Sequence, residues 1–275
     1  MATPIGNLAD LSLRAIAVLR GVDLIAAEDT RTTATLLAVH GVRTPMIAAH
    51  AHNQHQAAAR MSEALAQGKS VALVSDAGTP GISDPGGALV RAAHEGGHQV
   101  VPVPGACAAI AALSVSGFEG AFHFAGFLPP KSAARREALS VLARVPAHLV
   151  LYEAPHRIAA LAEDLARCVA LARRVLIARE ITKRFETIAL LSVGELPAWV
   201  AGDTNRARGE LVVVVERDAA PMVDLAEGER VLSLLLEELP AAKAARLAAA
   251  ISGAPRDALY RRALELRDPD QSERD

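Results

Sequence analysis

The sequence predicts an α/β protein built from two α/β lobes and a small helical appendage at the C-terminal end. Short aliphatic runs alternate with amphipathic helical patterns in the first half, a second and more hairpin-like α/β pattern follows residue 117, and helical patterns alone follow residue 226. At 275 residues and 51% apolar composition, the chain has the length of about two domains and can bury sizeable cores.

The first domain, residues 1–117, alternates strand and helix patterns. Short aliphatic runs, each ended by a polar residue or a Gly/Pro turn, predict buried strands at 23–28, 70–75 and 99–103. Apolar residues at helical spacing predict helices at 11–20, 33–40, 56–67 and 87–95. This order indicates a mostly parallel sheet with right-handed crossovers.

The segment Thr3–Asn7 resembles the turn that follows a strand, yet only Met1 and Ala2 precede it. We therefore expect a shortened or missing first strand in the first sheet, and a start site placed too far downstream is the simplest account. An N-terminal extension is then expected to raise the melting temperature, because it would complete the strand pairing.

The second domain, residues 118–220, has strand patterns at 148–152, 174–179, 187–193 and 210–215, and helical patterns at 131–144, 155–171 and 196–201. The appendage, residues 227–266, contains two helical patterns, 241–251 and 256–266, joined by a short turn that includes Gly253. The tail, residues 267–275, is polar and is expected to be frayed.

Charge, aromatic content and cysteine content exclude several classes of protein. The formal net charge of −2 creates no global attraction for a polyanion, and 3% aromatic residues argue against modules that stack bases on exposed rings. The two cysteines are far apart and lack a CxxC, which argues against a disulfide framework or a zinc site. No run approaches the ~18 apolar residues that cross a bilayer. We expect a cytoplasmic protein without membrane contact.

Rigid loops of small residues lie where the carboxyl ends of the predicted strands should meet. They are Thr3–Leu8, Ser75–Gly87 and Pro102–Ala106. Glycines let a ligand approach the backbone closely, and prolines stiffen the loops. Neither a P-loop nor the Rossmann glycine spacing is found in these turns. The convergence of such loops predicts a nucleotide-like or adenosine-containing ligand.

Two polar clusters in the first domain have alternative interpretations. The run Glu28–Arg31 is either a helix cap with an ion pair or a substrate-side cluster at the mouth of the ligand cleft. The three histidines His50, His52 and His55 are better explained as polar surface contacts than as metal ligands, because nothing near them in the sequence supplies the remaining ligands. No metal is predicted.

Charged residues also gather in the second domain and in the appendage. The runs Tyr152–Arg157 and Ala178–Thr187 follow predicted strands and indicate a polar cleft wall. In the appendage, basic residues outnumber acidic ones across two helices joined by a glycine turn. This arrangement fits a helix-turn-helix on nucleic acid, and equally a hairpin that packs or forms a dimer.

Together these motifs resemble the tetrapyrrole methylase superfamily and, more narrowly, its RNA-directed branch. The resemblance runs in order from Thr3 to about Glu265. It rests on TPIGNL, DLIAAEDTR, SDAGTPGISDPG, PGACAAIAAL, GFLPPK, YEAPHR, AREITKRFET and the pair Gly209-Glu210.

The resemblance implies a bilobal class III methyltransferase that binds S-adenosylmethionine between its domains and acts as a homodimer. Its expected substrate is the 2′-hydroxyl of a cytidine ribose in the decoding region of 16S ribosomal RNA, in the small ribosomal subunit. The implied cofactor residues are Pro4, Gly6, Asp76, Ala77, Gly78, Ile82, Ser83, Asp84, Pro104, Gly105, Ala106, Tyr152, Ala154, Ala178 and Gly209. The implied RNA contacts are Arg31, Arg157, Lys183, Lys243 and Arg261.

A methyl group on a sulfonium is already activated, so such an enzyme mainly aligns the reactants and draws a proton from the ribose hydroxyl. The candidate bases are Glu28, Asp29 and Glu186, and we hypothesise that the Glu28-Asp29 pair supplies the base. Two other functions stay open. One is methylation of a small tetrapyrrole, against which the basic appendage argues, and the other is a non-catalytic RNA-binding factor in ribosome assembly.

Overall fold

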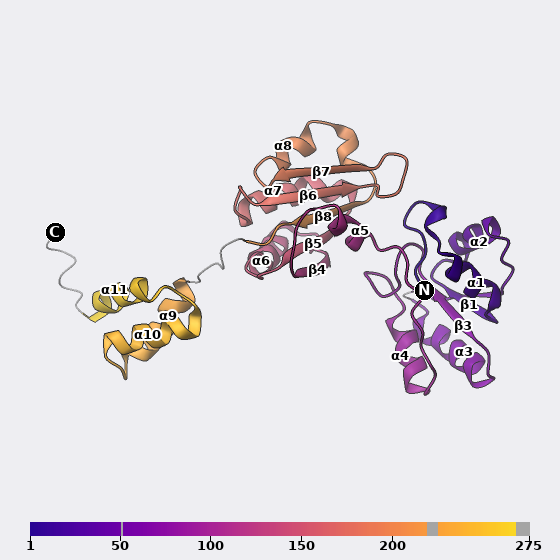
Figure 1. Cartoon of the computed structure of the whole chain (residues 1–275), viewed down its shortest axis with the longest axis horizontal. Coiled ribbons are helices and arrows are strands. Elements are labelled where there is room, and N and C mark those ends of the chain that lie inside the picture. The colour runs from indigo at the N-terminus through magenta and orange to yellow at the C-terminus, as the bar shows by residue number, and fades with distance from the viewer. Residues whose placement is uncertain (51, 219–224, 268–275) are drawn as a thin grey trace. The chain divides into compact units, whose positions relative to one another are not determined.

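The computed structural model describes residues 1–50, 52–218 and 225–267, and it confirms the predicted α/β class (Figure 1). The chain folds into two compact units, Met1–Arg217 and Asp218–Asp275. The first unit contains two sheets and is not divided further at residue 117. The predicted frayed tail lies outside the described residues apart from Arg267.

The first sheet has three parallel strands in the order β2-β1-β3: β1 (Leu24–Ala27), β2 (Met46–Ala48) and β3 (Val71–Val74). Strand β2 was not predicted. The helices of this region are α1 (Leu13–Gly21), α2 (Thr30–Val39), α3 (Gln54–Ala66) and α4 (Gly87–Glu95), and a 3-10 turn, η1 (Leu8–Asp10), precedes them in the chain.

Strand β1 is almost fully buried because helices cover both faces of the sheet. Ile25 and Ala27 belong to a core with α1 and α2, whereas Ala26 belongs to a core with α3 and α4. The alternation follows from the period of two along a strand, and burial on both faces explains why every residue of this run is apolar.

The predicted strand at 99–103 is wrong. These residues form no ladder, and Val101 is 62% exposed. The segment beside them is Met1–Thr3, which pairs through an isolated bridge between Thr3 and Gly78 and donates one hydrogen bond from Ala2 N to Val103 O at 3.2 Å. A strand needs a continuous partner, and so short a neighbour does not supply one.

The second sheet has the order β4-β5-β8-β6-β7, with β4 parallel to β5 and the other neighbours antiparallel. Its strands are β4 (Phe122–Phe127), which was not predicted, β5 (His148–Glu153), β6 (Arg174–Arg179), β7 (Thr187–Ser192) and β8 (Leu211–Val215). The helices of this region are α5 (Ala108–Ser114), α6 (Ser132–Leu142), α7 (Ile158–Cys168) and α8 (Leu196–Ala201), with short 3-10 turns η2 (Pro155–Arg157) and η3 (Thr204–Ala207).

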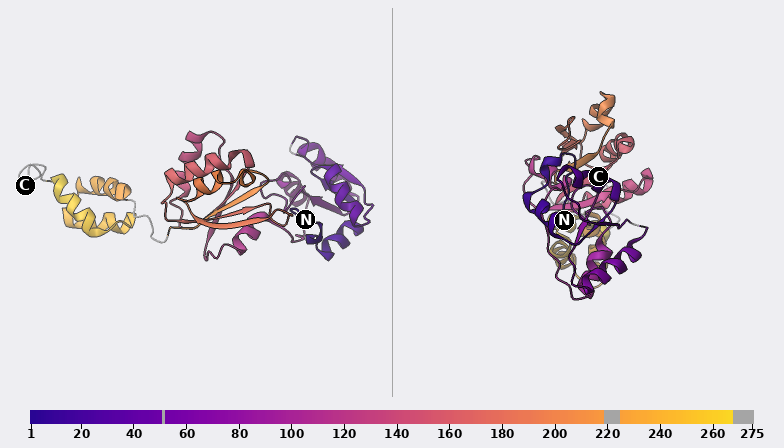
Figure 2. Two further views of the ribbon diagram at one scale, coloured as in Figure 1. Left: turned by 90° about the horizontal axis from the view of Figure 1, so that it is seen from above. Right: turned by 90° about the vertical axis from the view of Figure 1, so that its right-hand side faces the viewer.

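Helices cover both faces of this sheet, as Figure 2 shows. Along β5, Leu149 and Leu151 face the core shared with α6 and α7, whereas Val150 faces the core shared with α5. Charged side chains are buried between α6 and α7, where Arg135 and Asp164 pair at 2.6 Å with both side chains almost fully buried. Ser132 Oγ also donates to the Asp164 carboxylate at 2.9 Å.

The second unit consists of α9 (Leu225–Leu236), α10 (Ala241–Ser252) and α11 (Arg256–Arg267) around a small core. Its helices approach closely because its core is rich in alanine, with Ala244, Ala245, Ala248 and Ala263 fully buried. Within the described ranges of the chain, no helix is long and apolar enough to cross a membrane.

The Asp164→Ala substitution is expected to lower the free energy of unfolding of the first unit by about 3–5 kcal/mol, because it leaves the buried Arg135 guanidinium without its carboxylate. Urea denaturation monitored by circular dichroism measures the change. The matched control is Arg136→Ala, which removes an exposed partner of the same carboxylate at 3.6 Å and should cost under about 1 kcal/mol. Equal losses in the two variants would contradict this assignment.

Candidate functional site

A cavity of about 410 Å³ lies in the first unit, where loops within residues 1–117 meet strand ends of the second sheet. This volume is within the range of small-molecule sites. Its walls are mostly apolar with a few charged groups. The lining residues are Ile5, Ala77, Gly78, Thr79, Ile82, Ser83, Asp84, Cys107, Ala108, Phe127, Tyr152, Glu153, Ala154, Pro155, Ile181, Lys183, Glu210, Leu211 and Val212.

The structure brings about half of the predicted cofactor residues to this cavity. Those that line it are Ala77, Gly78, Ile82, Ser83, Asp84, Tyr152 and Ala154. Several of the others adjoin lining residues in the chain or the sheet. The predicted residues that do not line the cavity are Pro4, Gly6, Asp76, Pro104, Gly105, Ala106, Ala178 and Gly209. For example, Ala106 O accepts a hydrogen bond from Thr79 Oγ1 at 3.0 Å.

Sequence reasoning missed lining residues in motifs that it had otherwise identified. Phe127 belongs to GFLPPK and Ile181 to AREITKRFET, and both line the cavity. The signal that was available is their position at or directly after the ends of strands of the second sheet, since ligands bind beyond strand ends. Strand β4 itself was not predicted, so Phe127 had no place in the expected sheet.

The loop after β3 is held in place by its neighbours. Thr3 and Gly78 exchange two backbone hydrogen bonds, at 2.9 and 3.1 Å, and Ser75 Oγ donates to Gly78 O at 3.0 Å. Ser83 has a φ of 64°, which is unusual for a residue other than glycine. Such strain persists only where the surroundings fix the backbone, and here it lies on the cavity wall.

Lys183 connects the turn at Gly6 to the second sheet. Its Nζ donates to Glu180 Oε1 at 2.9 Å and to Glu210 Oε2 at 2.7 Å. Burial opposes the charge, but the hydrogen bonds to Glu210 and Glu180 outweigh it and raise the pKa of Lys183. A Cβ at Gly6 would collide with the Lys183 side chain, so a larger residue there would force Lys183 to shift. The predicted RNA contact therefore has two carboxylate partners within the chain.

The carboxylates of the Glu28-Asp29 cluster have different surroundings. Asp29 is the N-cap of α2, and its carboxylate accepts from Arg31 N at 2.8 Å and pairs with Arg31 Nη2 at 2.7 Å. The side-chain and backbone hydrogen bonds from Arg31 lower the pKa of Asp29 to about 2. Glu28 Oε2 accepts from Asp76 N at 3.2 Å, and Asp76 Oδ1 accepts from Asp29 N at 2.9 Å.

Asp84 has the opposite shift. Its burial, followed by repulsion from the charges of Glu28 and Asp76, raises the pKa of Asp84 to about 6. The three carboxylates give this side of the cavity a negative character that suits a cation. Tyr152 also lines the cavity; burial raises the pKa of Tyr152 to about 12, and its hydroxyl accepts a hydrogen bond from Ala109 N at 3.2 Å.

The remaining predicted residues are dispersed. Glu186 Oε2 accepts from Thr182 N at 2.6 Å, so it caps the turn after β6 and does not line the cavity. Arg157 donates to Leu128 O at 2.6 Å and is 19% exposed, whereas the Arg31 side chain is 90% exposed. In the second unit, Lys243 and Arg261 are both exposed.

His50, His52 and His55 are not arranged as the ligands of a metal ion. The rings of His50 and His52 lie 6.1 Å apart. No group of three or more potential metal ligands is found in the part of the chain that the structure describes. The expectation that the protein uses no metal stays a prediction.

Solved structures share this fold at low sequence identity. The methyltransferase CobJ aligns with a TM-score of 0.57 at 20% identity, covering 78% of this chain and 93% of that one. The uroporphyrin-III C-methyltransferase from Thermus thermophilus, complexed with S-adenyl homocysteine, aligns with a TM-score of 0.53 at 19% identity. The alignment covers 77% of this chain and 93% of that one.

Curated relatives are far more similar in sequence. The ribosomal RNA small subunit methyltransferase I of Escherichia coli O157:H7 is 51% identical over 265 residues, which is 96% of this chain and 93% of the relative. The protein of the same name from Pseudomonas aeruginosa is 50% identical over 269 residues, which is 96% of this chain and 95% of the relative.

Two family matches divide the chain. Residues 223–267 match the RsmI C-terminal HTH domain, which favours the helix-turn-helix interpretation of the second unit over a packing hairpin. Residues 2–197 match the tetrapyrrole (corrin/porphyrin) methylases, in agreement with the resemblance stated from the sequence motifs. The chain belongs to the tetrapyrrole methylase family.

Proposed function

We propose that this protein transfers the methyl group of S-adenosylmethionine to the 2′-hydroxyl of a cytidine ribose in the decoding region of 16S ribosomal RNA. The observation that carries the proposal is the cavity between the two sheets, in a chain about half identical, over nearly its whole length, to proteins named ribosomal RNA small subunit methyltransferase I. The substrate is the RNA alone or within the small subunit.

The cavity fits S-adenosylmethionine in size and charge. The cofactor supplies an activated methyl group on a sulfonium. Asp84 lines the wall near the charges of Glu28 and Asp76, and these carboxylates would attract the cationic end of the cofactor. Ala77 and Gly78 on one side and Ala154 on the other leave room for its close approach to the backbone.

The chain's own residues align the ribose hydroxyl and accept its proton. Alignment of the reactants can lower the activation barrier by ~7–11 kcal/mol, and the rigid loops around the cavity contribute to this alignment. Glu28 is the better base of the Glu28-Asp29 pair, because Asp29 is engaged with Arg31 and its lowered pKa makes it a poor proton acceptor. Glu186 is less suited, since its carboxylate caps a turn.

Exposed cations would hold the RNA backbone. Arg31 beside the carboxylate cluster and Lys243 and Arg261 on the helix-turn-helix unit are exposed, so their side chains can reach phosphates from the surface. Arg157 and Lys183 donate to groups within the chain, so we assign them a positioning role beside any RNA contact.

We also propose that the protein is a homodimer and lies in the cytoplasm. Ile188 and Leu190 on β7 are exposed apolar residues at the edge of the second sheet, and a second copy would bury them. Cys107 and Cys168 are free thiols, which suits a reducing compartment.

The direct test is transfer of tritium from labelled S-adenosylmethionine to purified small subunits that lack the modification. Nuclease digestion is expected to place the label in 2′-O-methylcytidine. Label in a small tetrapyrrole and none in RNA would overturn the proposal in favour of the other branch of the family. Label in neither would indicate a non-catalytic RNA-binding protein.

Glu28→Gln is expected to lower kcat by about 10²-fold or more, because an amide cannot accept the ribose proton. Asp29→Asn should reduce the rate less and should also lower the melting temperature, since it weakens the cap of α2. Glu186→Gln is the matched carboxylate control and should keep the wild-type rate. Single-turnover methylation measures all three, and wild-type rates for Glu28→Gln would remove Glu28 as the base.

The KM for S-adenosylmethionine is expected to increase as the pH falls below about 6. Because its pKa is raised to about 6, Asp84 is charged above that value and neutral below it, where it no longer attracts the sulfonium. The Asp84→Asn variant should have a raised KM for S-adenosylmethionine at all pH values, and this KM should not increase further as the pH falls below about 6. Binding of S-adenosylhomocysteine, whose sulfur is neutral, is the control and should change less; a pH-independent KM in the wild type would contradict the role of Asp84.

A further inference from the structure

Phe127 presents an aromatic ring at the cavity. It is the last residue of β4, its exposed fraction is 55%, and it lines the cavity wall. An exposed ring loses the stabilisation that burial would give, so its place beside a ligand cavity needs a physical reason. The chain has only eight aromatic residues of the Phe, Trp and Tyr types, which makes this position more informative.

The backbone before Phe127 is irregular and packs closely against the loop after β3. The register between β4 and β5 shifts between Phe124 and Gly126, and Gly126 has a φ of 62°. A Cβ at Gly126 would lie 3.1 Å from Ser83 Oγ, so the loop after β3 packs tightly here. The ring of Tyr152 meets that of Phe127 edge to face, with centroids 5.8 Å apart.

A buried ion pair fixes the residues that follow. Arg157 donates to Leu128 O at 2.6 Å and pairs with Glu153 at 3.0 Å, and the Glu153 side chain is fully buried. The backbone directly after Phe127 is therefore tied to η2. A backbone held in place before a ligand binds reduces the entropy lost on binding.

We propose that the Phe127 ring is a stacking surface for a nucleobase in the cavity, either the adenine of the cofactor or the base of the target nucleotide. The inference rests on the proposed function for the identity of these bases. A phenyl ring offers a flat apolar face without hydrogen-bond groups, which suits stacking and not the recognition of a particular base edge. Phe127 is thus a binding residue that sequence analysis did not assign.

Phe127→Leu keeps an apolar side chain but removes the ring. Calorimetric titration with S-adenosylhomocysteine and the KM for small subunits are measured on the full chain. We expect about a tenfold loss in one of them, the usual effect of one stacking contact. A loss for S-adenosylhomocysteine identifies adenine as the stacked base, and a loss for the subunit alone identifies the target base. Phe127→Tyr, which keeps a ring, should retain wild-type values.

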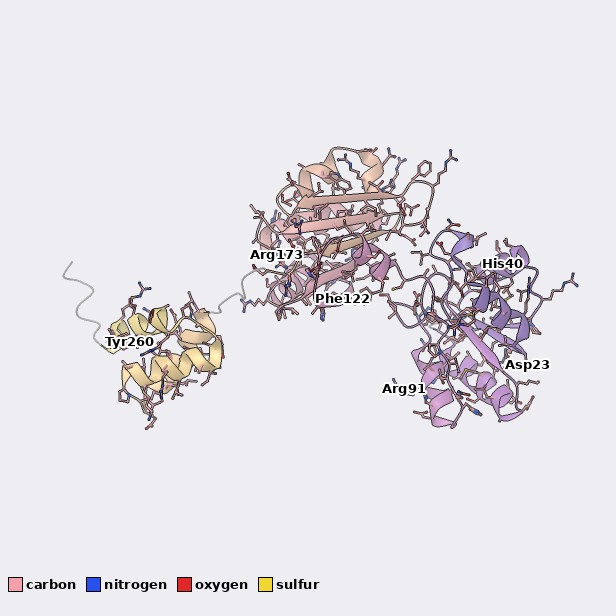
Figure 3. The ribbon with its side chains drawn as sticks, viewed as in Figure 1. Asp23, His40, Arg91, Phe122, Arg173 and Tyr260 are labelled. Carbon is pink, nitrogen blue, oxygen red and sulfur yellow. The ribbon has the colours of Figure 1, made fainter. Side chains whose placement is uncertain are left out.

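The matched control is Phe122→Leu. Phe122 begins the same strand, has an exposed fraction of 47%, does not line the cavity and is labelled in Figure 3. This variant should bind both ligands as the wild type does. Wild-type affinities for both ligands in Phe127→Leu, or equal losses in the Phe122→Leu control, would overturn the proposal.

Phe127→Trp gives a readout that does not depend on catalysis. The single tryptophan of the chain, Trp199, lies on α8 away from the cavity lining, so the wild-type signal can be subtracted. Stacking should quench the new indole on addition of S-adenosylhomocysteine or, for the target base, on addition of small subunits. No quenching by either would overturn the proposal. The S-adenosylhomocysteine arm remains decisive for adenine even if no methyl group reaches RNA.

Discussion

At the edge of the cavity the backbone at Gly6 approaches the side chain of Lys183 so closely that a Cβ there would force a shift. Glu180 and Glu210 hold the Lys183 amino group, so its methylene carbons lie in one place and the N-terminal turn packs against them. Ile5, the neighbour of Gly6, lines the cavity. The contact with Lys183, which Glu180 and Glu210 hold, thus adds to the hydrogen bonds between Thr3 and Gly78 in positioning the N-terminal turn.

Local environment gives two aspartates of the first unit opposite pKa shifts. Asp29 accepts hydrogen bonds from Arg31 at an exposed helix terminus, and its pKa falls to about 2. Asp84 is partly buried near two like charges, and its pKa rises to about 6. Both shifts follow from which protonation state the surroundings favour. A carboxylate that stays ionised in an ion pair organises structure, whereas one that titrates near neutrality can respond to a cationic ligand.

The sequence predicted most of the strand ends and loops that form the cavity, because aliphatic runs and glycine-rich turns are local signals. One of its two interpretations of Glu28–Arg31, a helix cap with an ion pair, is present at Asp29 and Arg31, but the backbone acceptors of other charged side chains were not predicted. Arg157 was predicted to contact RNA, but it donates to Leu128 O, 29 residues earlier in the chain, in addition to its local pair with Glu153. The run at 99–103 has the composition of a strand, yet strand formation depends on a neighbour that its own residues do not specify. Strand β4 was missed because glycine and histidine interrupt its apolar pattern.

The low aromatic content describes the whole chain and does not say where its few aromatic rings lie. Phe124, Phe127 and Tyr152 gather at the ends of two paired strands, with ring centroids 4.9 and 5.8 Å from that of Tyr152. Tyr152 is held by the amide of Ala109, and the ring of Phe127 remains open to the cavity. A chain poor in aromatic residues can therefore still place one ring where a nucleobase would meet it. The composition argues against an extended stacking platform, and the proposed transfer to a single ribose needs none.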